Sequence, residues 1–407
     1  DINSIYLNEI DQKEFKLSKN DYLEDFNYAY DTLKHYYPFF EINKKLYDVN
    51  WMDKREDYEK YILESKNDRD FYNRMNDILS EINNWHTHLI DESSGLAMYL
   101  TYYQIPKSNW RHDLSKLYEK EKVRRRYNIN NNAIKKYIDE NVKNSSDSAI
   151  PSQDDNMTTE IIIEDDLAYI KIKLMLGDLY RKKDEEILNE FLEKVKNYSN
   201  LVIDIRGNGG GDSRYWQEFL LPKIIDKDYQ TKTYNFIKSG ELNKKIIKQE
   251  NFSPDVRGFL NQSDFNADVK EVLKDFDYYS SNDDIIKARK DSINFKGDIY
   301  LLVDGGVYSS SEKLASFCKE TKLAKLVGTK TAGDGIGFDP MQVDLPNSGY
   351  ILRFSNNLGL SESGSINEMD KTSPDIYVNE KFTYTTNKLV DQKIIKAVIK
   401  DAGIINE

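Results

Sequence analysis

The sequence predicts an α/β protein whose first part is helical. Between residues 20 and 89, apolar side chains recur at three- and four-residue spacing, first from Tyr22 to Tyr37 and again from Phe71 to Ile82. That spacing is typical of one face of an amphipathic helix. From residue 159 onward, short apolar runs alternate with helical patterns, which indicates parallel strands joined by helices.

The helical part ends at a turn and is followed by a polar stretch. Asn83 and Asn84 precede Trp85-His86-Thr87-His88 and indicate a helix stop. Residues 143–157 are rich in Ser, Asn and Asp and predict an exposed loop or linker. We therefore expect a helical domain over residues 1–95, a connecting segment and linker over 96–157, and an α/β domain over 158–407.

Within the α/β domain the elements follow in order. Strands are predicted at 159–163, 167–172, 201–205, 298–303 and 325–327, with a hairpin at 342–355. Helices are predicted at 184–198, 311–321 and 388–400. Residues 215–294 are highly charged and predict a mostly helical insertion.

Composition excludes several classes of partner. The chain has 407 residues of which 39% are hydrophobic, enough to bury a sizeable core. Its net charge of -12 repels nucleic acid and anionic membranes. The longest apolar runs are strand-sized, so no membrane span is predicted. Cys318 is the single cysteine and cannot form an internal disulfide, so cysteine usage does not decide the compartment.

The chain begins at Asp1 and not at a methionine. We expect an extracellular or cell-envelope protein of a bacterium, with a signal or anchor segment removed. A cytoplasmic location stays open.

A glycine cluster, Arg206-Gly207-Asn208-Gly209-Gly210-Gly211-Asp212, follows the buried strand at 201–205. Such loops turn backbone N–H groups outward to hold an anion. A phosphate-binding loop would need Gly-Lys-Ser/Thr where Gly211-Asp212-Ser213 stands, and a dinucleotide loop would need glycine in place of Asp212. An oxyanion hole needs only one or two amides, and an ordinary flexible turn is the alternative.

A serine-rich turn, Asp304 to Glu312, joins the strand at 298–303 to the next helix. A serine at such a turn has an exposed hydroxyl near a helix N-terminus, which suits a nucleophile. The alternative is that these serines only cap the helix.

A serine nucleophile needs a base, usually His or Lys. Of the four histidines, His86 and His88 stand at the turn after the helical part, whereas His35 and His112 stand beside no other motif. The pair could bind a metal only with a remote third ligand, so we predict no metal or cofactor.

These segments resemble, in order and context, the tail-specific (C-terminal processing) serine proteases, peptidase family S41. The resemblance is carried by Asp204–Gly211, Val303–Glu312, Gly328–Gly335 and Thr372–Ile376. It implies a crotonase-like (ClpP-like) β-superhelix in the α/β domain and Ser309 as the nucleophile. It also ranks Glu312, on the helix after the nucleophile, as structural.

The resemblance also selects a base. One branch of the family uses a lysine in Phe-Gly-Lys-Gly, but this chain has Asp334 there. The tricorn-like branch uses a histidine from the N-terminal domain and a glutamate before a Pro-Asp-Ile ending, which His86 and Glu368 match. His88 is the chief rival to His86, and Lys330 is a residual candidate for the base.

The resemblance then implies a Ser309, His86, Glu368 triad, with an oxyanion hole formed by the N–H groups of Gly211 and Ser310 and with Gly210 as the substitute. The expected activity is a serine endopeptidase acting on extended or unfolded polypeptides. Its partner is a protein or peptide substrate, no peptide-binding PDZ module is evident, and the oligomeric state is open.

Two alternatives remain. One is a noncatalytic ligand or peptide carrier on the same fold. The other is a crotonase-like enzyme acting on acyl thioesters, for which the sequence shows no acyl-CoA signature.

Overall fold

The computed structural model describes residues 2–140, 155–178, 180–380 and 388–404. The chain forms two compact units. The first comprises Asp1–Glu140, Phe236–Ser280 and Gly337–Leu358, and the second comprises Asn141–Asn235, Ser281–Ile336 and Gly359–Glu407. The chain therefore passes between the units several times, which its sequence pattern did not indicate.

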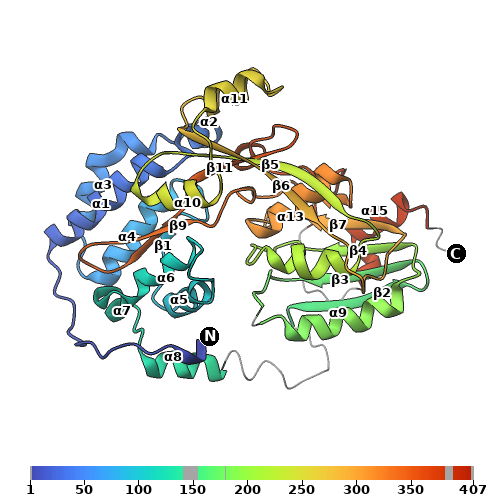
Figure 1. Cartoon of the computed structure of the whole chain (residues 1–407), viewed down its shortest axis with the longest axis horizontal. Coiled ribbons are helices and arrows are strands. Elements are labelled where there is room, and N and C mark those ends of the chain that lie inside the picture. Colours follow the sequence, from blue (N-terminus) through green and yellow to red (C-terminus); the bar gives the residue numbers. More distant parts are fainter. Residues whose placement is uncertain (1, 141–154, 179, 381–387, 405–407) are drawn as a thin grey trace. The chain divides into compact units, whose positions relative to one another are not determined.

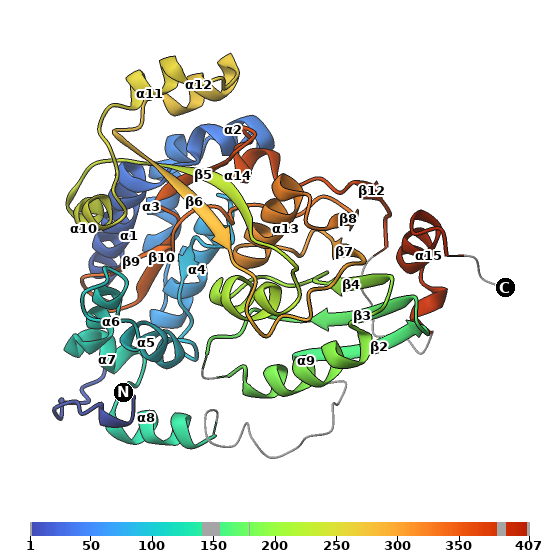
Figure 2. The same ribbon diagram turned by 45° about the vertical axis from the view of Figure 1, so that its right-hand side comes forward.

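The first unit is mainly helical (Figures 1 and 2). Its α-helices are α1 (Lys19–Tyr36), α2 (Phe40–Tyr47), α3 (Arg55–Leu63), α4 (Asp68–Ser80), α5 (Gly95–Tyr103), α6 (His112–Glu119), α7 (Glu121–Arg126), α8 (Asn131–Ile138), α10 (Lys244–Gln249), α11 (Val256–Gln262) and α12 (Ala267–Leu273). Short 3-10 helices cover Ile2–Ser4, Trp51–Lys54 and Glu241–Asn243. An antiparallel sheet runs in the order β1 (His88–Leu89), β10 (Ile351–Phe354) and β9 (Met341–Asp344).

Local chemistry explains why α1 begins where it does. Ser18 is the N-cap: its Oγ accepts from the Asp21 N–H at 3.2 Å, and the Asp21 carboxylate accepts from the Ser18 N–H at 2.7 Å. This capping box satisfies two of the amides that a helix start leaves without partners. The face predicted from the spacing is buried, and Tyr30 on it stacks on Trp51 with ring centroids 5.2 Å apart.

The helix stop expected after residue 82 is confirmed, because α4 ends at Ser80 and Asn83 adopts a left-handed φ of 56°. The four helices α5 to α8 were not predicted individually, since this region was described only as a connecting segment. The linker predicted at 143–157 falls largely on residues 141–154, which lie outside the described residues.

The second unit contains a six-stranded sheet in the order β12 (Ile376–Tyr377), β8 (Lys325–Gly328), β7 (Asp298–Val303), β4 (Asn200–Asp204), β3 (Leu167–Ile172) and β2 (Met157–Ile163). All neighbours are parallel except β2 and β3. The α-helices are α9 (Lys182–Val195), α13 (Ser310–Thr321), α14 (Asn367–Asp370) and α15 (Lys393–Asp401). A π-helix covers Tyr215–Leu220, and 3-10 helices cover Leu221–Lys223 and Leu389–Asp391.

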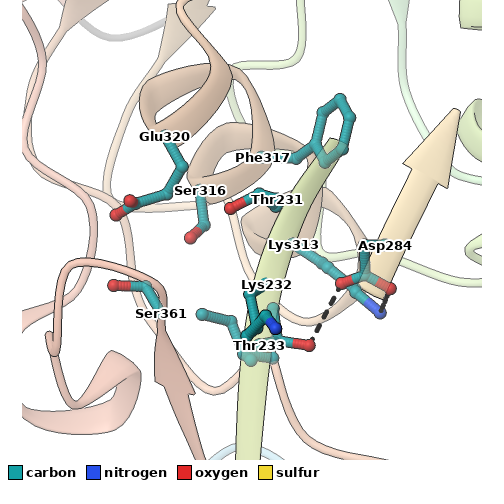
Figure 3. A pocket seen from close by; sticks show the side chains of 10 residues that line it. Thr231, Lys232, Thr233, Asp284, Lys313, Ser316, Phe317, Glu320 and Ser361 are labelled. Atoms are coloured by element: carbon teal, nitrogen blue, oxygen red, sulfur yellow. Dashed lines mark hydrogen bonds and ion pairs between the residues drawn. The ribbon is translucent and has the colours of Figure 1, made fainter. Parts of the chain in front are cut away.

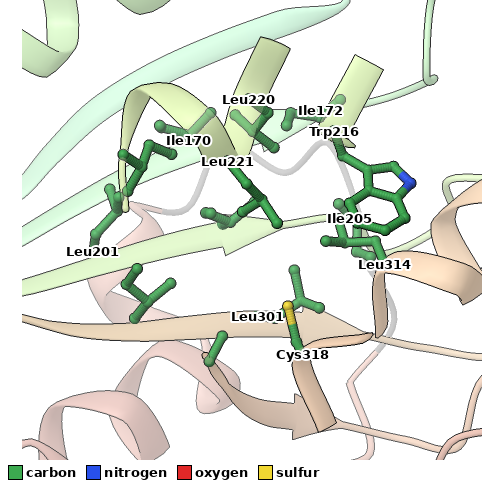
Figure 4. Close-up of a cluster of buried hydrophobic side chains, with 14 of the residues drawn as sticks. Ile170, Ile172, Leu201, Ile205, Trp216, Leu220, Leu221, Leu301, Leu314 and Cys318 are labelled. Atoms are coloured by element: carbon green, nitrogen blue, oxygen red, sulfur yellow. The ribbon is translucent and has the colours of Figure 1, made fainter. Parts of the chain in front are cut away.

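Helices cover both faces of this sheet, as parallel strands require. Side chains alternate between the faces, so Leu167 and Tyr169 of β3 pack with Ile394 and Val398 of α15, whereas Ala168 and its alternate neighbours pack on the other face. Figure 4 shows the cluster on this other face: Leu220 lies near Ile170 and Ile172 of β3, Trp216 and Leu314 lie beside Ile205, and Cys318 of α13 lies near Leu301 of β7. The strands 167–172 and 298–303 match the prediction to the residue.

The prediction of a mostly helical segment at 215–294 is wrong for two stretches. β5 (Tyr229–Ile237) and β6 (Tyr278–Ile286) are nine-residue strands and form a sheet with β11 (Asn357–Ser361) in the order β11-β5-β6. On β5 the alternate buried residues are Thr231, Thr233 and Asn235. Because these side chains are polar, the period of two is invisible to a hydropathy pattern. The last helix also begins later than predicted, at Lys393.

Within the part of the chain that the structure describes, no helix is long and apolar enough to cross a membrane.

Candidate active site

The carboxyl ends of three neighbouring strands meet at one edge of the six-stranded sheet. Asp204 at the end of β4 pairs with Leu302 of β7, and Leu302 pairs with Val327 of β8. The glycine cluster follows β4, the serine turn follows β7, and residues 329–336 follow β8. In open α/β sheets this edge is where ligands bind.

Ser309 has a strained backbone immediately before α13. Its φ is 57° and its ψ is -124°, a combination that costs an L-residue about 1–3 kcal/mol and that the nucleophiles of strand-turn-helix sites adopt. Ser309 stands at the N-cap position, yet its side chain makes no capping hydrogen bond. Ser311 Oγ donates instead to Asn208 Oδ1 at 2.6 Å. The capping interpretation of these two serines is therefore wrong.

The glycine cluster lies against Ser309. A Cβ placed on Gly210, whose φ is 105°, would be 2.8 Å from Ser309 Cβ and 3.0 Å from Ser310 N. Gly211, at φ 134°, would place a Cβ 2.1 Å from the Met175 carbonyl oxygen. Met175 fixes the loop from the other side, because its N–H donates to Gly210 O at 3.0 Å and its carbonyl accepts from Asp212 N–H at 2.8 Å. Only glycine fits at either position.

The amides of the glycine cluster and of the serine turn differ in whether they are already hydrogen-bonded. Gly210 N–H donates to Asn208 Oδ1 at 3.0 Å. In contrast, the N–H groups of Gly211 and Ser310 make no hydrogen bond within the described ranges. This favours Gly211 over Gly210 as the donor from the loop.

A buried ion cluster supports the start of the glycine cluster. Asp204 and Arg206 are fully buried and lie 2.7 Å apart, and Tyr169 OH donates to the same carboxylate at 2.7 Å. Lys171 Nζ donates to the Arg206 carbonyl at 2.5 Å. Burial by itself raises the pKa of Asp204, but the charges of Lys171 and Arg206 hold it below its usual range. A carboxylate so paired is fixed in its ionised form.

The segment that carries Glu368 is tied to α13 through Glu312. Glu312 is fully buried, and its Oε1 accepts from Asn367 Nδ2 at 2.8 Å and from Thr372 Oγ1 at 2.6 Å. Asn367 Oδ1 in turn accepts from Gly335 N–H at 2.7 Å. Glu368, the residue after Asn367, is buried in the same unit as Ser309. Glu312 thus links α13 to residues 367–372, and the structural role that the resemblance implied for it stays a prediction.

His86 belongs to the first unit and is held by its own turn. Asn84 Oδ1 accepts from His86 N–H at 3.1 Å and from Thr87 Oγ1 at 2.9 Å. His86 Nδ1 lies 3.3 Å from Ser355 Oγ, just beyond the end of β10. The structure therefore gathers Ser309, Glu368 and the glycine cluster in the second unit and places His86 in the first.

The rival bases are poorly suited. His88 Nδ1 lies 3.0 Å from the Trp85 carbonyl, which can only accept, so this nitrogen is the donor. Burial, with the charge of Arg353, lowers the pKa of His88 to about 4, below the range useful for a base at neutral pH. Lys330 has an exposed side chain. Asp334 accepts from Tyr308 OH at 3.3 Å.

A hollow on the flank of α13 is a separate feature (Figure 3). Its sides come from β5, β6 and α13, and Lys313 pairs with Asp284 at 3.1 Å within it. Thr233 Oγ1 donates to the same carboxylate at 3.3 Å. Lys313 and Asp284 thus neutralise each other, and the hollow is lined neither by Ser309 nor by the glycine cluster. No group of His, Cys, Asp and Glu suited to a metal occurs among the described residues.

The strained backbone of Ser309 gives a stability prediction. Ser309→Gly should be more stable than Ser309→Ala. Its free energy of unfolding should be about 1–2 kcal/mol higher, because glycine adopts a positive φ without strain. The order should reverse at Ser316, in the middle of α13, where glycine costs about 1 kcal/mol relative to alanine. Urea denaturation of the four variants measures both differences. If the glycine variant were the more stable one at both positions, or the less stable one at both, the strain at Ser309 would be contradicted.

The buried carboxyl of Glu312 gives a pH prediction. Burial raises its pKa from 4.5 to about 7, so the folded state holds a proton that the unfolded state releases. The resulting penalty is absent below pH about 4.5 and complete above pH about 7, and a shift of this size corresponds to about 3 kcal/mol. The stability of Glu312→Gln relative to the unchanged chain should therefore rise across this window in urea denaturation. A constant difference from pH 4 to 8 would contradict it.

Comparisons with known proteins give a family for this chain and similar folds. The sequence model of peptidase family S41 matches residues 166–378, just over half of the chain. Mature CPAF complexed with lactacystin matches with a TM-score of 0.56 and 13% identity over 94% of this chain and 98% of that one. Mature CPAF alone matches with a TM-score of 0.54 and 13% identity over 89% and 93%.

The photosystem II D1 C-terminal processing protease gives a TM-score of 0.41 and 14% identity over 89% and 94% of the two chains. A search of the curated proteins found no significant match. The glycine cluster, the serine turn and Glu368 all lie inside the matched region, and His86 precedes it. The chain belongs to peptidase family S41, as its motifs predicted.

Proposed function

We propose that this chain is a serine endopeptidase in which Ser309 attacks the peptide carbonyl. The observation that carries the proposal is the strained backbone of Ser309 in contact with Gly210. The amides of Gly211 and Ser310 make no hydrogen bond to any described residue. A capping serine needs neither the strain nor the neighbouring glycines. Membership of a peptidase family supplies the reaction class.

The remaining roles follow from the chemistry that the nucleophile needs. His86 takes the hydroxyl proton of Ser309 and gives it to the leaving amine, and Glu368 orients His86 and stabilises its charged form. The N–H groups of Gly211 and Ser310 hold the oxyanion of the tetrahedral intermediate. The evidence for His86 is its motif, its turn and the unsuitability of His88 and Lys330 described above.

The proposal extends to architecture and substrate. The second unit is a crotonase-like catalytic body, and the helical N-terminal part supplies His86. The substrates are extended or unfolded polypeptides, since a backbone oxyanion hole recognises the peptide group and no particular side chain. A noncatalytic carrier is disfavoured, because a carrier has no use for a strained serine.

The central test measures turnover of fluorescein-labelled casein together with labelling by a fluorophosphonate probe. The unchanged chain should do both. Ser309→Ala and His86→Ala should each lower the rate by about 10³-fold or more, and Glu368→Gln by about 10²- to 10⁴-fold.

His88→Asn is the matched control for His86→Ala, since it stands two residues away. It should keep its rate within about threefold, because His88 Nδ1 is bonded to the Trp85 carbonyl and burial lowers the pKa of His88 to about 4, which makes it a weak base at neutral pH. If Ser309→Ala cleaved casein as fast as the unchanged chain does, the proposal would be wrong. An unchanged chain that neither labels nor cleaves would favour the carrier.

The contact between Gly210 and Ser309 gives a further prediction. Gly210→Ala should lower kcat by about 10²-fold, because the new methyl must displace either the nucleophile or the loop and a displacement near 1 Å has that effect.

Gly209→Ala is the control for this variant. It is the adjacent glycine, and a Cβ there meets no atom within 4 Å. Its kcat should stay within about threefold of that of the unchanged chain. If both variants lost activity equally, the loop as a whole and not the contact with Ser309 would be responsible.

A further inference from the structure

Asn208 is a fully buried residue of the glycine cluster whose side chain contacts three different segments. Its Oδ1 accepts from Gly210 N–H at 3.0 Å and from Ser311 Oγ at 2.6 Å. Its Nδ2 donates to the Ile172 carbonyl, at the end of β3, at 3.1 Å. The orientation of the carboxamide is unambiguous, because an amide N–H can only donate and a carbonyl can only accept.

The backbone of Asn208 adds a fourth connection. Its carbonyl accepts from Tyr308 N–H at 3.2 Å, one residue before the nucleophile. Asn208 therefore joins β3, the glycine cluster, the nucleophile turn and the first turn of α13. All of these belong to the second unit, so the connections form one continuous network.

We propose that Asn208 is a positioning residue that determines which amide of the glycine cluster faces the substrate carbonyl. The Asn208 side chain engages Gly210 N–H and thereby turns this amide away from a ligand, while Gly211 N–H makes no hydrogen bond to any residue that the structure describes. The inference rests on the proposed peptidase function and deepens it, because it explains why Gly211 and not Gly210 pairs with Ser310.

The flexibility of Gly210 and Gly211 is the reason that a positioning residue is needed. Gly210 and Gly211 both adopt positive φ values, which glycine leaves as readily as it enters. An oxyanion hole is effective only when its donors are fixed before the charge develops. The Asn208 carboxamide supplies that rigidity, and Ser311 transmits it to the helix that follows the nucleophile.

The chemistry also explains why asparagine stands here. The position needs an acceptor for Gly210 and Ser311 and a donor for Ile172 on one short side chain. Aspartate lacks the donor, and serine is too short to reach all three groups. Replacing Asn208 by alanine leaves Gly210 N–H and Ser311 Oγ without this acceptor in a buried site, so the loop is free to reorient.

The test compares Asn208→Ala with Asn200→Ala, the unchanged chain and Ser309→Ala. Asn200 is the matched control: it is also buried, opens the strand β4 that leads into the cluster, and donates to Asp166 O. The measurements are thermal unfolding, kcat and KM on fluorescein-labelled casein, and the second-order rate constant for fluorophosphonate labelling.

For Asn208→Ala we expect kcat to fall by at least about tenfold with KM within about threefold, since the oxyanion forms only in the transition state. The labelling rate should fall by a similar factor. Asn200→Ala should keep kcat within about threefold even where it unfolds at a lower temperature. A merely structural role would instead make kcat follow the unfolding temperature in both variants.

The inference is overturned if Asn208→Ala keeps its kcat within threefold, loses activity only through KM, or is matched in its loss by Asn200→Ala. Should Asn208→Ala fail to fold, Asn208→Ser takes its place under the same criteria. If the unchanged chain is active and these criteria fail, only the role of Asn208 is wrong. If the unchanged chain is inactive, the proposed function itself fails.

Discussion

Parallel pairing of β4 with β7 is the constraint on which the candidate site depends. The two strands are separated by almost one hundred residues, yet their register brings Asp204 beside Leu302. The glycine cluster and the serine turn leave these strands at the same edge of the sheet. Without this pairing, no local feature of either segment would place Gly210 against Ser309.

The buried polar groups around this edge bond to one another and to the backbone of the loops that leave it. Asp204, Arg206 and Lys171 hold the start of the glycine cluster, and Glu312 with Asn367 holds the segment that contains Glu368. Burial of such groups is expensive unless every partner is in place. Their concentration at one edge suggests that rigidity matters most there, as preorganised electrostatic catalysis requires.

Much of the fold could be predicted because its buried strands and helices are marked by apolar side chains at regular spacing. The strands at 167–172 and 298–303 are buried on both faces and were found without error. β5 was missed because Thr231, Thr233 and Asn235 occupy its inward positions, so burial there leaves no hydropathy signal. The passage of the chain between two units could not be predicted either, because it depends on tertiary contacts.

The candidate site also has a part that the sequence predicted and a part that only the folded chain reveals. Motifs named Ser309, Gly211 and Glu368, and the structure adds the positive φ of Ser309 and the close approach of Gly210 to it. Asn208 was given no role of its own from the sequence, although it lies in the glycine cluster, because an asparagine between glycines indicates only a turn. Its four connections, to residues from Ile172 to Ser311, exist only in the folded chain.

The most direct measurement is a crystal structure of the chain after reaction with a fluorophosphonate. We expect phosphorus bonded to Ser309 Oγ and a phosphoryl oxygen about 2.7–3.1 Å from the amide nitrogens of Gly211 and Ser310. A phosphorus atom on another residue, or a phosphoryl oxygen directed away from both amides, would contradict it.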